Sequence, residues 1–481
     1  MIDFRPVGYV VGLLVAILGG TMLIPMMVDL AVGNDNWFAM LESAVICITL
    51  GMALAGGCLN GAGEKLTLQQ VFLLTTAVWL ALPTFGALPF VLGAPNARFV
   101  DAFFEAMSGF TTTGSTVFVG LEELPHGTLL WRGMLQWFGG VGIIVVAMVF
   151  LPELGVGGMQ LFKSEGFETD GKILPRARQI ASQVSVIYVV LTVACGLIYA
   201  LLGMSGFDAI VHSMTTISTG GMANYDSSFG GFSAGEHYCA SIFMILSALP
   251  FVRYVQFMFG SPRSLWRDTQ VRTFLIIVTV ITLAITFWEW RREGFDELQF
   301  REALFNTTSI ITGTGYSSAD YQLWGTFPVV VLFLTGLVGG CAGSTACSVK
   351  VFRYQILFAS LKAQVRGIHS PSGIFVPRYD GRPIPDAVLS SVMFFFTTFI
   401  LSLGVLSVLL GMTGLDFATS LSGAATAMAN IGPGLGKEIG PSGNFAGLND
   451  TAKWLLAIAM MVGRLELLAV LTLLTPQFWR V

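Results

Sequence analysis

Long apolar stretches, separated by short polar ones, dominate the chain. A helix needs about 20 apolar residues to cross a hydrocarbon core of about 30 Å. Ten stretches reach that length, and the eighth is interrupted near its middle; they cover residues 7–28, 37–59, 67–93, 127–151, 180–203, 235–259, 273–290, 322–366, 387–412 and 451–474. The pattern predicts an all-α polytopic membrane protein with ten crossings. Because that number is even, both termini are expected on the same side.

Composition supports this prediction and removes several classes of protein. Of the 481 residues 54% are hydrophobic and only 11% are charged, whereas soluble domains carry about 25% charged residues. The net charge of −4 provides no basic surface for nucleic acid. No A-x-A-like cleavage site follows the first apolar stretch, so this stretch is expected to remain as the first span.

Charge is distributed unevenly between the two sides of the predicted membrane. Segments on the side of the termini hold 17 of the 25 Lys and Arg residues, and segments on the other side hold 19 of the 29 Asp and Glu residues. The positive-inside rule then places both termini in the cytoplasm. An acidic outer face attracts cations, although ordinary solvation of the outer loops explains these acids equally well.

Four outer segments resemble one another. Each begins with an acidic residue, continues for about ten helical residues and ends in a Thr-, Ser- or Asn-containing turn with glycine; they are residues 101–116, 208–222, 302–316 and 416–434. Each lies between two spans, so the repeating unit is span, re-entrant segment, span. The expected division is a two-span extension and four repeats, namely residues 1–63, 64–165, 166–262, 263–375 and 376–481.

The re-entrant segments are too short to cross the membrane. The acidic residue suits the positive end of a helix dipole, and the glycine lets the chain leave the helix at membrane depth. Irregular backbone survives there only inside protein or beside a water-filled cavity. One such segment could be an ordinary turn. Four around one axis predict a ring of carbonyl oxygens that replaces the hydration shell of a monovalent cation.

The motifs in these segments carry a family resemblance; they are Gly109–Gly114, Ser218–Gly221, Thr314–Tyr316 and Asn430–Gly434. With the two additional N-terminal spans, the chain resembles, over its whole length, the Trk/Ktr/HKT superfamily of potassium transporters, in its TrkH/TrkG branch. The resemblance implies four membrane–pore–membrane repeats in a pseudo-fourfold arrangement, in the cell inner (plasma) membrane. It also implies K⁺ as the transported ion, with no organic cofactor on this chain.

The same resemblance implies which residues form the selectivity filter. Carried over by motif, they are Thr112, Thr113 and Gly114; Ser218, Thr219 and Gly220; Gly313, Thr314 and Gly315; and Asn430, Ile431 and Gly432. Gly313 departs from the family pattern, in which threonine is common. Because backbone carbonyls bind the ion, ion binding is expected to survive this departure.

The interruption of the eighth stretch predicts a gate. Its residues have low helix propensity and include Gly339, Gly340, Gly343, Ser344 and Thr345. The resemblance implies an intramembrane loop that blocks the pore below the filter, whereas a helix-packing face of small residues is the alternative.

One basic residue, Arg464, is expected deep inside the last span. A charge at that depth needs a partner, and Arg464 is expected to hold the gate loop through carbonyls of residues 339–345 or through an acid. Glu466 is two residues away and therefore points to another face of the helix.

The cytoplasmic loops are short and basic, and the chain has no P-loop. Nucleotide control would therefore come from another chain, and the resemblance implies a homodimer with a cytosolic nucleotide-binding regulatory subunit of the TrkA type. The basic loops are also explained by the positive-inside rule alone.

A symporter and an intramembrane enzyme would each need residues that a channel-like transporter does not. A symporter that couples K⁺ to H⁺ or Na⁺ would favour further buried acids, of which only Glu153 and Glu466 are evident. An intramembrane enzyme would need a catalytic cluster at membrane depth, and the sequence shows none. The chain is therefore expected to be a transporter, not an enzyme.

Overall fold

The computed structural model describes residues 3–61, 66–149, 177–258, 260, 263–294, 296–465 and 467–480. Glu153, Glu466 and most of the basic segment 163–178 lie outside the described residues. The expected repeat boundaries at residues 63, 165 and 262 also lie outside them. All structural statements below concern the described residues.

The described chain is almost entirely helical, in agreement with the predicted all-α class. Seven helices or near-continuous helix pairs are long and apolar enough to cross a membrane. They are α1 (Arg5–Thr21) with α2 (Leu23–Val32), α3 (Trp37–Gly57), α4 (Leu68–Gly86) with α5 (Leu88–Leu92), α7 (His126–Val149), α10 (Ala177–Leu202), α15 (Thr269–Glu293) and α19 (Asp386–Met412).

The other three expected spans are broken. The broken pairs are α12 (Ala234–Ser247) with α13 (Phe251–Met258), α17 (Thr326–Gly336) with α18 (Val351–His369), and α21 (Asp450–Arg464) with α22 (Leu467–Leu473). The first pair bends by 87° next to Pro250, which lacks the backbone N–H that a continuous helix needs. The sequence predicted an interruption only between α17 and α18, and the bend between α12 and α13 was not expected.

Four shorter helices match the four predicted re-entrant segments; they are α6 (Phe99–Phe110), α11 (Gly206–Ile217), α16 (Glu297–Thr312) and α20 (Phe417–Ala429). Side chains cap three of their N-termini. Ser205 accepts a hydrogen bond from the Asp208 N–H, Asp296 forms a capping box with Gln299, and Asp416 accepts from the Thr419 N–H. These caps satisfy free N–H groups at the start of three of the four helices. Of the acids expected to begin the helices only Asp416 is a cap, because α6, α11 and α16 start two to five residues before Asp101, Asp208 and Glu302.

The remaining elements are short. They are the 3₁₀ helices η1 (Leu59–Gly61), η2 (Leu121–Glu123) and η3 (Tyr321–Trp324), the helices α14 (Ser264–Arg267) and α23 (Pro476–Trp479), and the strands β1 (Arg378–Tyr379) and β2 (Arg382–Pro383). The two strands pair antiparallel.

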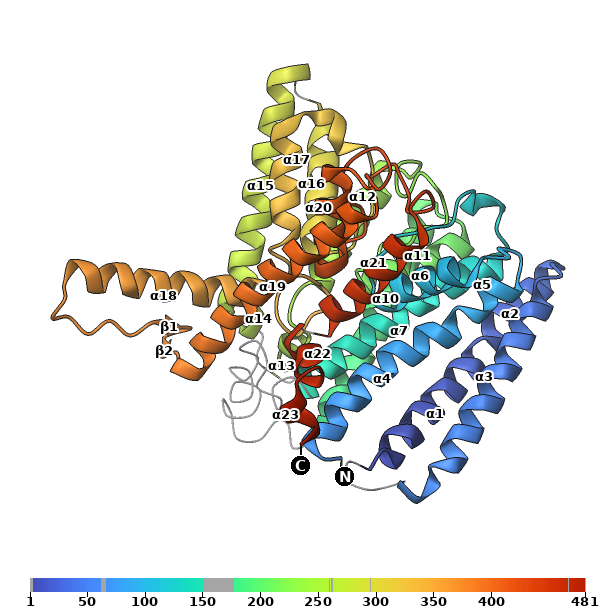
Figure 1. Cartoon of the computed structure of the whole chain (residues 1–481). Coiled ribbons are helices and arrows are strands. Elements are labelled where there is room, and N and C mark those ends of the chain that lie inside the picture. The colour runs from blue at the N-terminus through green and yellow to red at the C-terminus, as the bar shows by residue number, and fades with distance from the viewer. Residues whose placement is uncertain are drawn as a thin grey trace.

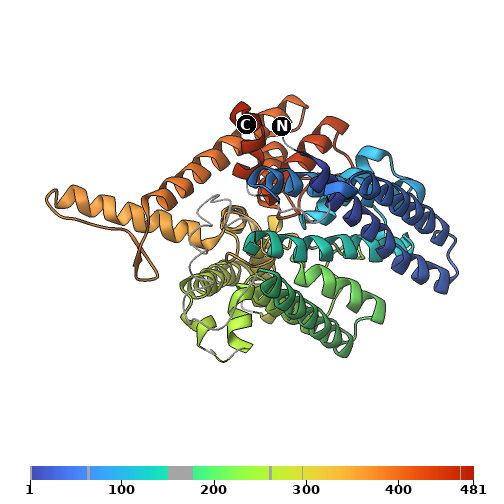
Figure 2. The same ribbon diagram turned by 90° about the horizontal axis from the view of Figure 1, so that it is seen from below.

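The helices gather around the four short ones. Figure 1 shows α1, α2 and α3 (blue) on one side of the molecule, and α18 with the β1–β2 ribbon (orange) projecting from the other side. The view from below in Figure 2 shows the same opposition. Both termini lie together at one end, as the even number of predicted crossings requires.

Candidate functional site

The backbone leaves the four short helices in the same way. Three residues with a common conformation follow each helix, directly after α16 and α20 and one residue later after α6 and α11. The first and third of the three have positive φ. The pairs are Thr112 (53°) and Gly114 (85°), Thr219 (50°) and Gly221 (77°), Gly313 (72°) and Gly315 (82°), and Asn430 (51°) and Gly432 (111°). This conformation is rare outside glycine, so its recurrence at matching places defines four equivalent segments.

Hydrogen bonds give the same correspondence. In each segment the N–H of the middle residue donates to the carbonyl five residues earlier. These bonds run from Thr113 to Ser108 (2.9 Å), Gly220 to Thr215 (2.9 Å), Thr314 to Ser309 (2.9 Å) and Ile431 to Thr426 (3.1 Å). The equivalent triplets are therefore 112–114, 219–221, 313–315 and 430–432.

The second triplet differs by one residue from the sequence prediction of Ser218, Thr219 and Gly220. The Ser218 N–H still bonds to the Met214 carbonyl, so Ser218 caps α11 and precedes the turn. Gly221, not Gly220, has the positive φ that matches Gly114. Two consecutive glycines hide this register in the sequence, because either of them can adopt the conformation.

The four triplets form a closed ring. A Cβ atom built on the third residue of each triplet would collide with the carbonyl oxygen of the middle residue in the next triplet. The close approaches are Gly114 to Gly220, Gly221 to Thr314, Gly315 to Ile431 and Gly432 to Thr113, the last at 2.8 Å. Each triplet thus touches the next in chain order and the fourth returns to the first. Only glycine leaves room for these contacts.

Above the ring lies a pocket of about 170 Å³ lined by Gly114, Gly221, Gly315 and Gly432. Arg132 and Asp226 line it as well. Among the described residues, no group of three or more His, Cys, Asp or Glu side chains could hold a metal ion.

A buried ion pair, which the sequence analysis missed, supports the first two triplets. Arg132 Nε lies 2.8 Å from Glu105 Oε1, and the two side chains are 2% and 0% exposed. Arg132 Nη1 also donates to the Ala223 carbonyl at 2.9 Å. The sequence did contain one indication of this pair: Arg132 lies inside a predicted span, where a charged side chain needs a partner.

Gln136, one turn further along α7, was also missed. Its Nε2 donates to the Gly220 carbonyl at 2.5 Å, and its Oε1 accepts from the Met222 N–H at 3.0 Å. One amide side chain thus holds the backbone on both sides of Gly221.

The fourth repeat is joined to the first on the outer side of the ring. Lys453, on α21, is 3% exposed and lies 2.6 Å from Asp101 on α6. Arg98 pairs with Asp101 and also with Asp450. Both acids raise the pKa of Arg98 by hydrogen bonds and charge, so it stays protonated in this network.

The interrupted segment, residues 337–350, forms a buried loop below the ring. The first break, beside Pro250, holds it: the Cys341 N–H donates to the Ala248 carbonyl (3.0 Å), and the Phe251 N–H donates to the Gly343 carbonyl (2.9 Å). Gly339, Gly340, Gly343, Ser344 and Thr345 are all buried.

The loop touches the ring through Cys347. Its Sγ lies 3.6 Å from the Thr112 hydroxyl, and its N–H donates to the Thr312 carbonyl at 3.4 Å. The sequence gives no sign of this contact, because a cysteine among apolar residues is usually a small buried side chain.

Arg464 contacts the loop, as the sequence predicted. Its Nη1 donates to the Thr345 carbonyl at 3.3 Å and to Cys347 Sγ. The side chain is 5% exposed, and its Nε and Nη2 have no hydrogen-bond partner among the described residues. A void of about 30 Å³ beside this contact is lined by Asn430, Cys347 and Arg464, and also by Phe395 and Phe399 of α19.

Comparison with known proteins gives one consistent family. Residues 38–480 match the TrkH family, described as cation transport proteins. The chain is 46% identical over 413 residues to the Trk system potassium uptake protein TrkI of Halomonas elongata, covering 85% of this chain and 84% of that protein. It is 36% identical over 484 residues to the Trk system potassium uptake protein TrkH of Escherichia coli K12, covering 99% of each.

A solved structure matches along the full length. The crystal structure of the potassium transporter TrkH from Vibrio parahaemolyticus covers 100% of both chains with a TM-score of 0.91 and 34% sequence identity.

Proposed function

The chain belongs to the TrkH family of cation transport proteins, and from this premise we propose that it takes up potassium ions through the ring of four triplets. The closed ring is the observation that carries this proposal. It brings backbone carbonyls from four equivalent segments to one place, with glycines that let the segments approach. Such carbonyl rings replace the hydration shell of K⁺.

The filter residues in this proposal are the four structural triplets. They keep eleven of the residues expected from the sequence and exchange Ser218 for Gly221; the set is Thr112, Thr113, Gly114, Thr219, Gly220, Gly221, Gly313, Thr314, Gly315, Asn430, Ile431 and Gly432. The threonines contribute through their backbone carbonyls, which do not depend on the side chain. Two carbonyls of the set, those of Gly220 and Gly432, also accept hydrogen bonds from the side chains of Gln136 and Ser115.

The gate in this proposal is the loop at residues 337–350 with Arg464. The loop lies against the ring, where Cys347 contacts Thr112. The positive charge of Arg464, buried beside the loop, opposes the passage of K⁺. The described conformation is therefore the closed one, and conduction requires the loop and Arg464 to move away from the axis.

The orientation follows from charge. We place both termini in the cytoplasm and the pocket above the ring outside, in the cell inner membrane, because Lys and Arg concentrate on the side of the termini. Membrane lipid surrounds the spans. A homodimer and a cytosolic nucleotide-binding regulatory subunit of the TrkA type complete the proposed assembly; the chain binds no nucleic acid, carries no organic cofactor and is not an enzyme.

Ion flux through purified protein in proteoliposomes tests the proposed function. With an outward K⁺ gradient and no Na⁺ or proton gradient, we expect a K⁺ current that reverses at the K⁺ equilibrium potential. Concentrative uptake that needs a Na⁺ or proton gradient would contradict the channel-like pathway and support the symporter. Empty liposomes, and protein with Na⁺ as the only cation, are the controls.

A further inference from the structure

We propose that four pore-helix side chains, Glu105, His212, Asn306 and Ser422, act as positioning residues that fix the outer ends of the filter triplets and so set their ion selectivity. This inference rests on the proposed function. These four residues bind no ion themselves. They affect the filter by holding the backbone that follows each triplet.

The same contact recurs in the first three repeats. A polar side chain on the pore helix accepts a hydrogen bond from the backbone N–H twelve residues later, which lies four residues beyond the middle residue of the triplet. Glu105 Oε2 accepts from Val117 (2.9 Å), His212 Nε2 from Asn224 (3.4 Å), and Asn306 Oδ1 from Ser318 (3.3 Å). A carboxylate, an imidazole and an amide thus perform one task at equivalent positions.

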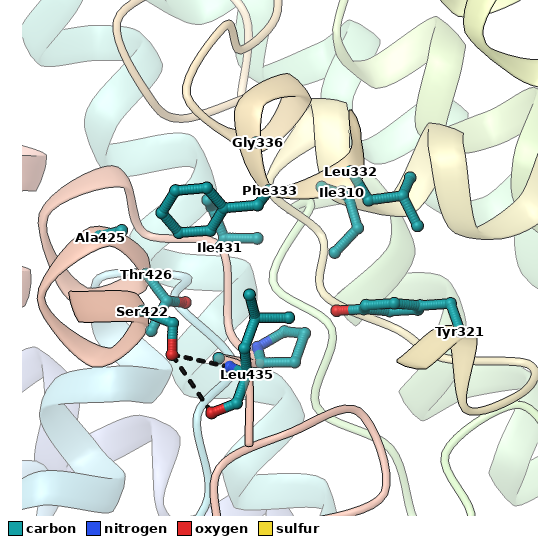
Figure 3. A pocket seen from close by; sticks show the side chains of 12 residues that line it. Ile310, Tyr321, Leu332, Phe333, Gly336, Ser422, Ala425, Thr426, Ile431 and Leu435 are labelled. Carbon is teal, nitrogen blue, oxygen red and sulfur yellow. Dashed lines mark hydrogen bonds between the residues drawn. The ribbon is translucent and has the colours of Figure 1, made fainter. Parts of the chain in front are cut away.

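The fourth repeat performs the task with a different residue. Gly423 occupies the position that matches Glu105, and it has no side chain to offer. Instead, Ser422 Oγ accepts from the Leu435 N–H at 2.8 Å, and it also lies 3.3 Å from the Leu435 carbonyl. Figure 3 shows both bonds from the Ser422 hydroxyl to Leu435. The contact is therefore kept although the residue that makes it has shifted by one place.

Burial explains why these bonds matter. His212 and Asn306 are fully buried, and Ser422 is 3% exposed. A buried backbone N–H without an acceptor is costly. Each bond therefore holds the segment that follows a triplet at a fixed distance from the short helix (α6, α11, α16 or α20) that precedes the triplet. Since K⁺ and Na⁺ differ only slightly in radius, a filter whose strands could shift would lose discrimination between them.

To accept these hydrogen bonds, the His212 ring must carry its proton on Nδ1, and the Asn306 amide must point its oxygen toward Ser318. His212 Nδ1 lies 2.9 Å from the Asp208 carbonyl, which leaves Nε2 free of hydrogen to accept from Asn224. Asn306 Nδ2 donates to the Glu302 carbonyl and to Ser318 Oγ at 2.9 and 2.8 Å, which orients its Oδ1 toward the Ser318 N–H. Each acceptor is itself fixed by a second hydrogen bond, as expected of a positioning group.

Ser422 offers the sharpest test. A pocket of about 20 Å³ borders it, lined also by Ile310, Tyr321 and Leu435, and Figure 3 shows it beside the Ser422 hydroxyl. Threonine keeps the hydroxyl and places its methyl group against this space, whereas alanine removes the acceptor. We expect S422A to lower the K⁺ over Na⁺ permeability ratio, measured from bi-ionic reversal potentials, by about fivefold, and S422T to restore it to near the wild-type value.

A second variant and a matched control complete the experiment. N306L removes the acceptor in the third repeat at similar size, and it is expected to lower the ratio by a similar factor. Thr307 neighbours Asn306 and is buried, but its hydroxyl has no hydrogen-bond partner among the described residues; T307V should leave the ratio unchanged. If one acceptor variant does not fold, the other carries the test.

The outcomes separate this inference from the proposed function. Wild-type protein that conducts no K⁺ would overturn the proposed function. Wild-type protein that selects K⁺, together with unaltered selectivity in S422A and N306L, would overturn the positioning role alone. An equal loss in S422A and S422T would assign the effect to packing and also overturn it.

Discussion

Replacing Gly221 with serine is expected to abolish most of the discrimination between K⁺ and Na⁺. Gly221 has φ of +77°, and a Cβ atom there would collide with the Thr314 carbonyl oxygen of the next triplet. A residue with a side chain adds about 1–2 kcal/mol for the left-handed conformation alone. Since the clash falls on a ring carbonyl, we expect the K⁺ over Na⁺ permeability ratio to fall at least about tenfold. Bi-ionic reversal potentials in proteoliposomes measure this ratio.

Two comparisons make the test specific. G114S meets the Gly220 carbonyl in the same way at φ +85°, so it should have a similar effect. Gly20 in α1 has no atom within 4 Å of an added Cβ, and G20S should behave as wild type. At Gly220 the three atoms nearest an added Cβ all belong to the Gln136 side chain, which can move more easily than backbone, so G220S should weaken selectivity less than G221S. Normal selectivity in both G221S and G114S would refute the ring.

Removing the charge of Arg464 should produce the largest rise in K⁺ flux. At an effective dielectric constant near 20, two like unit charges about 8 Å apart repel by about 2 kcal/mol, and closer charges repel more strongly. The R464A variant also loses the bond that holds the Thr345 carbonyl. We therefore expect K⁺ flux through protein without regulatory subunit to increase about tenfold or more, measured as ⁸⁶Rb⁺ or K⁺ efflux from loaded vesicles.

The matched variant is R464K, which keeps the charge at this depth and should keep the flux low. Shortening the loop between Gly339 and Thr345 tests the steric part separately, and it is expected to raise the flux with Arg464 in place. Flux that stays at the wild-type level in both R464A and the shortened loop would contradict the assigned gate.

Much of the architecture could be predicted from the sequence because its signals are local. Apolar length predicts the spans, and an acidic start followed by glycine predicts the four re-entrant helices. The bends that the sequence missed have weaker signals. Pro250 lies between apolar residues that continue the span, so the bend between α12 and α13 interrupts a stretch that appears continuous in the sequence.

In the candidate site, too, the features with a local sequence signal could be predicted and those that depend on distant contacts could not. Motifs located the triplets, but they could not decide between Gly220 and Gly221, because only the backbone dihedral angles distinguish two consecutive glycines. Contacts such as Thr112 with Cys347 join residues 235 positions apart. Gln136 and Glu105 act on backbone that folds against them from elsewhere in the chain, so their roles become visible only in three dimensions.

The most direct test of the central claim is to locate the ion. Crystals grown or soaked in Rb⁺, measured at the rubidium absorption edge, should show an anomalous peak inside the ring, coordinated by carbonyls of residues 112–114, 219–221, 313–315 and 430–432. The peak should vanish in G221S. A wild-type ring without anomalous density, or rubidium bound only to side chains elsewhere, would contradict the account.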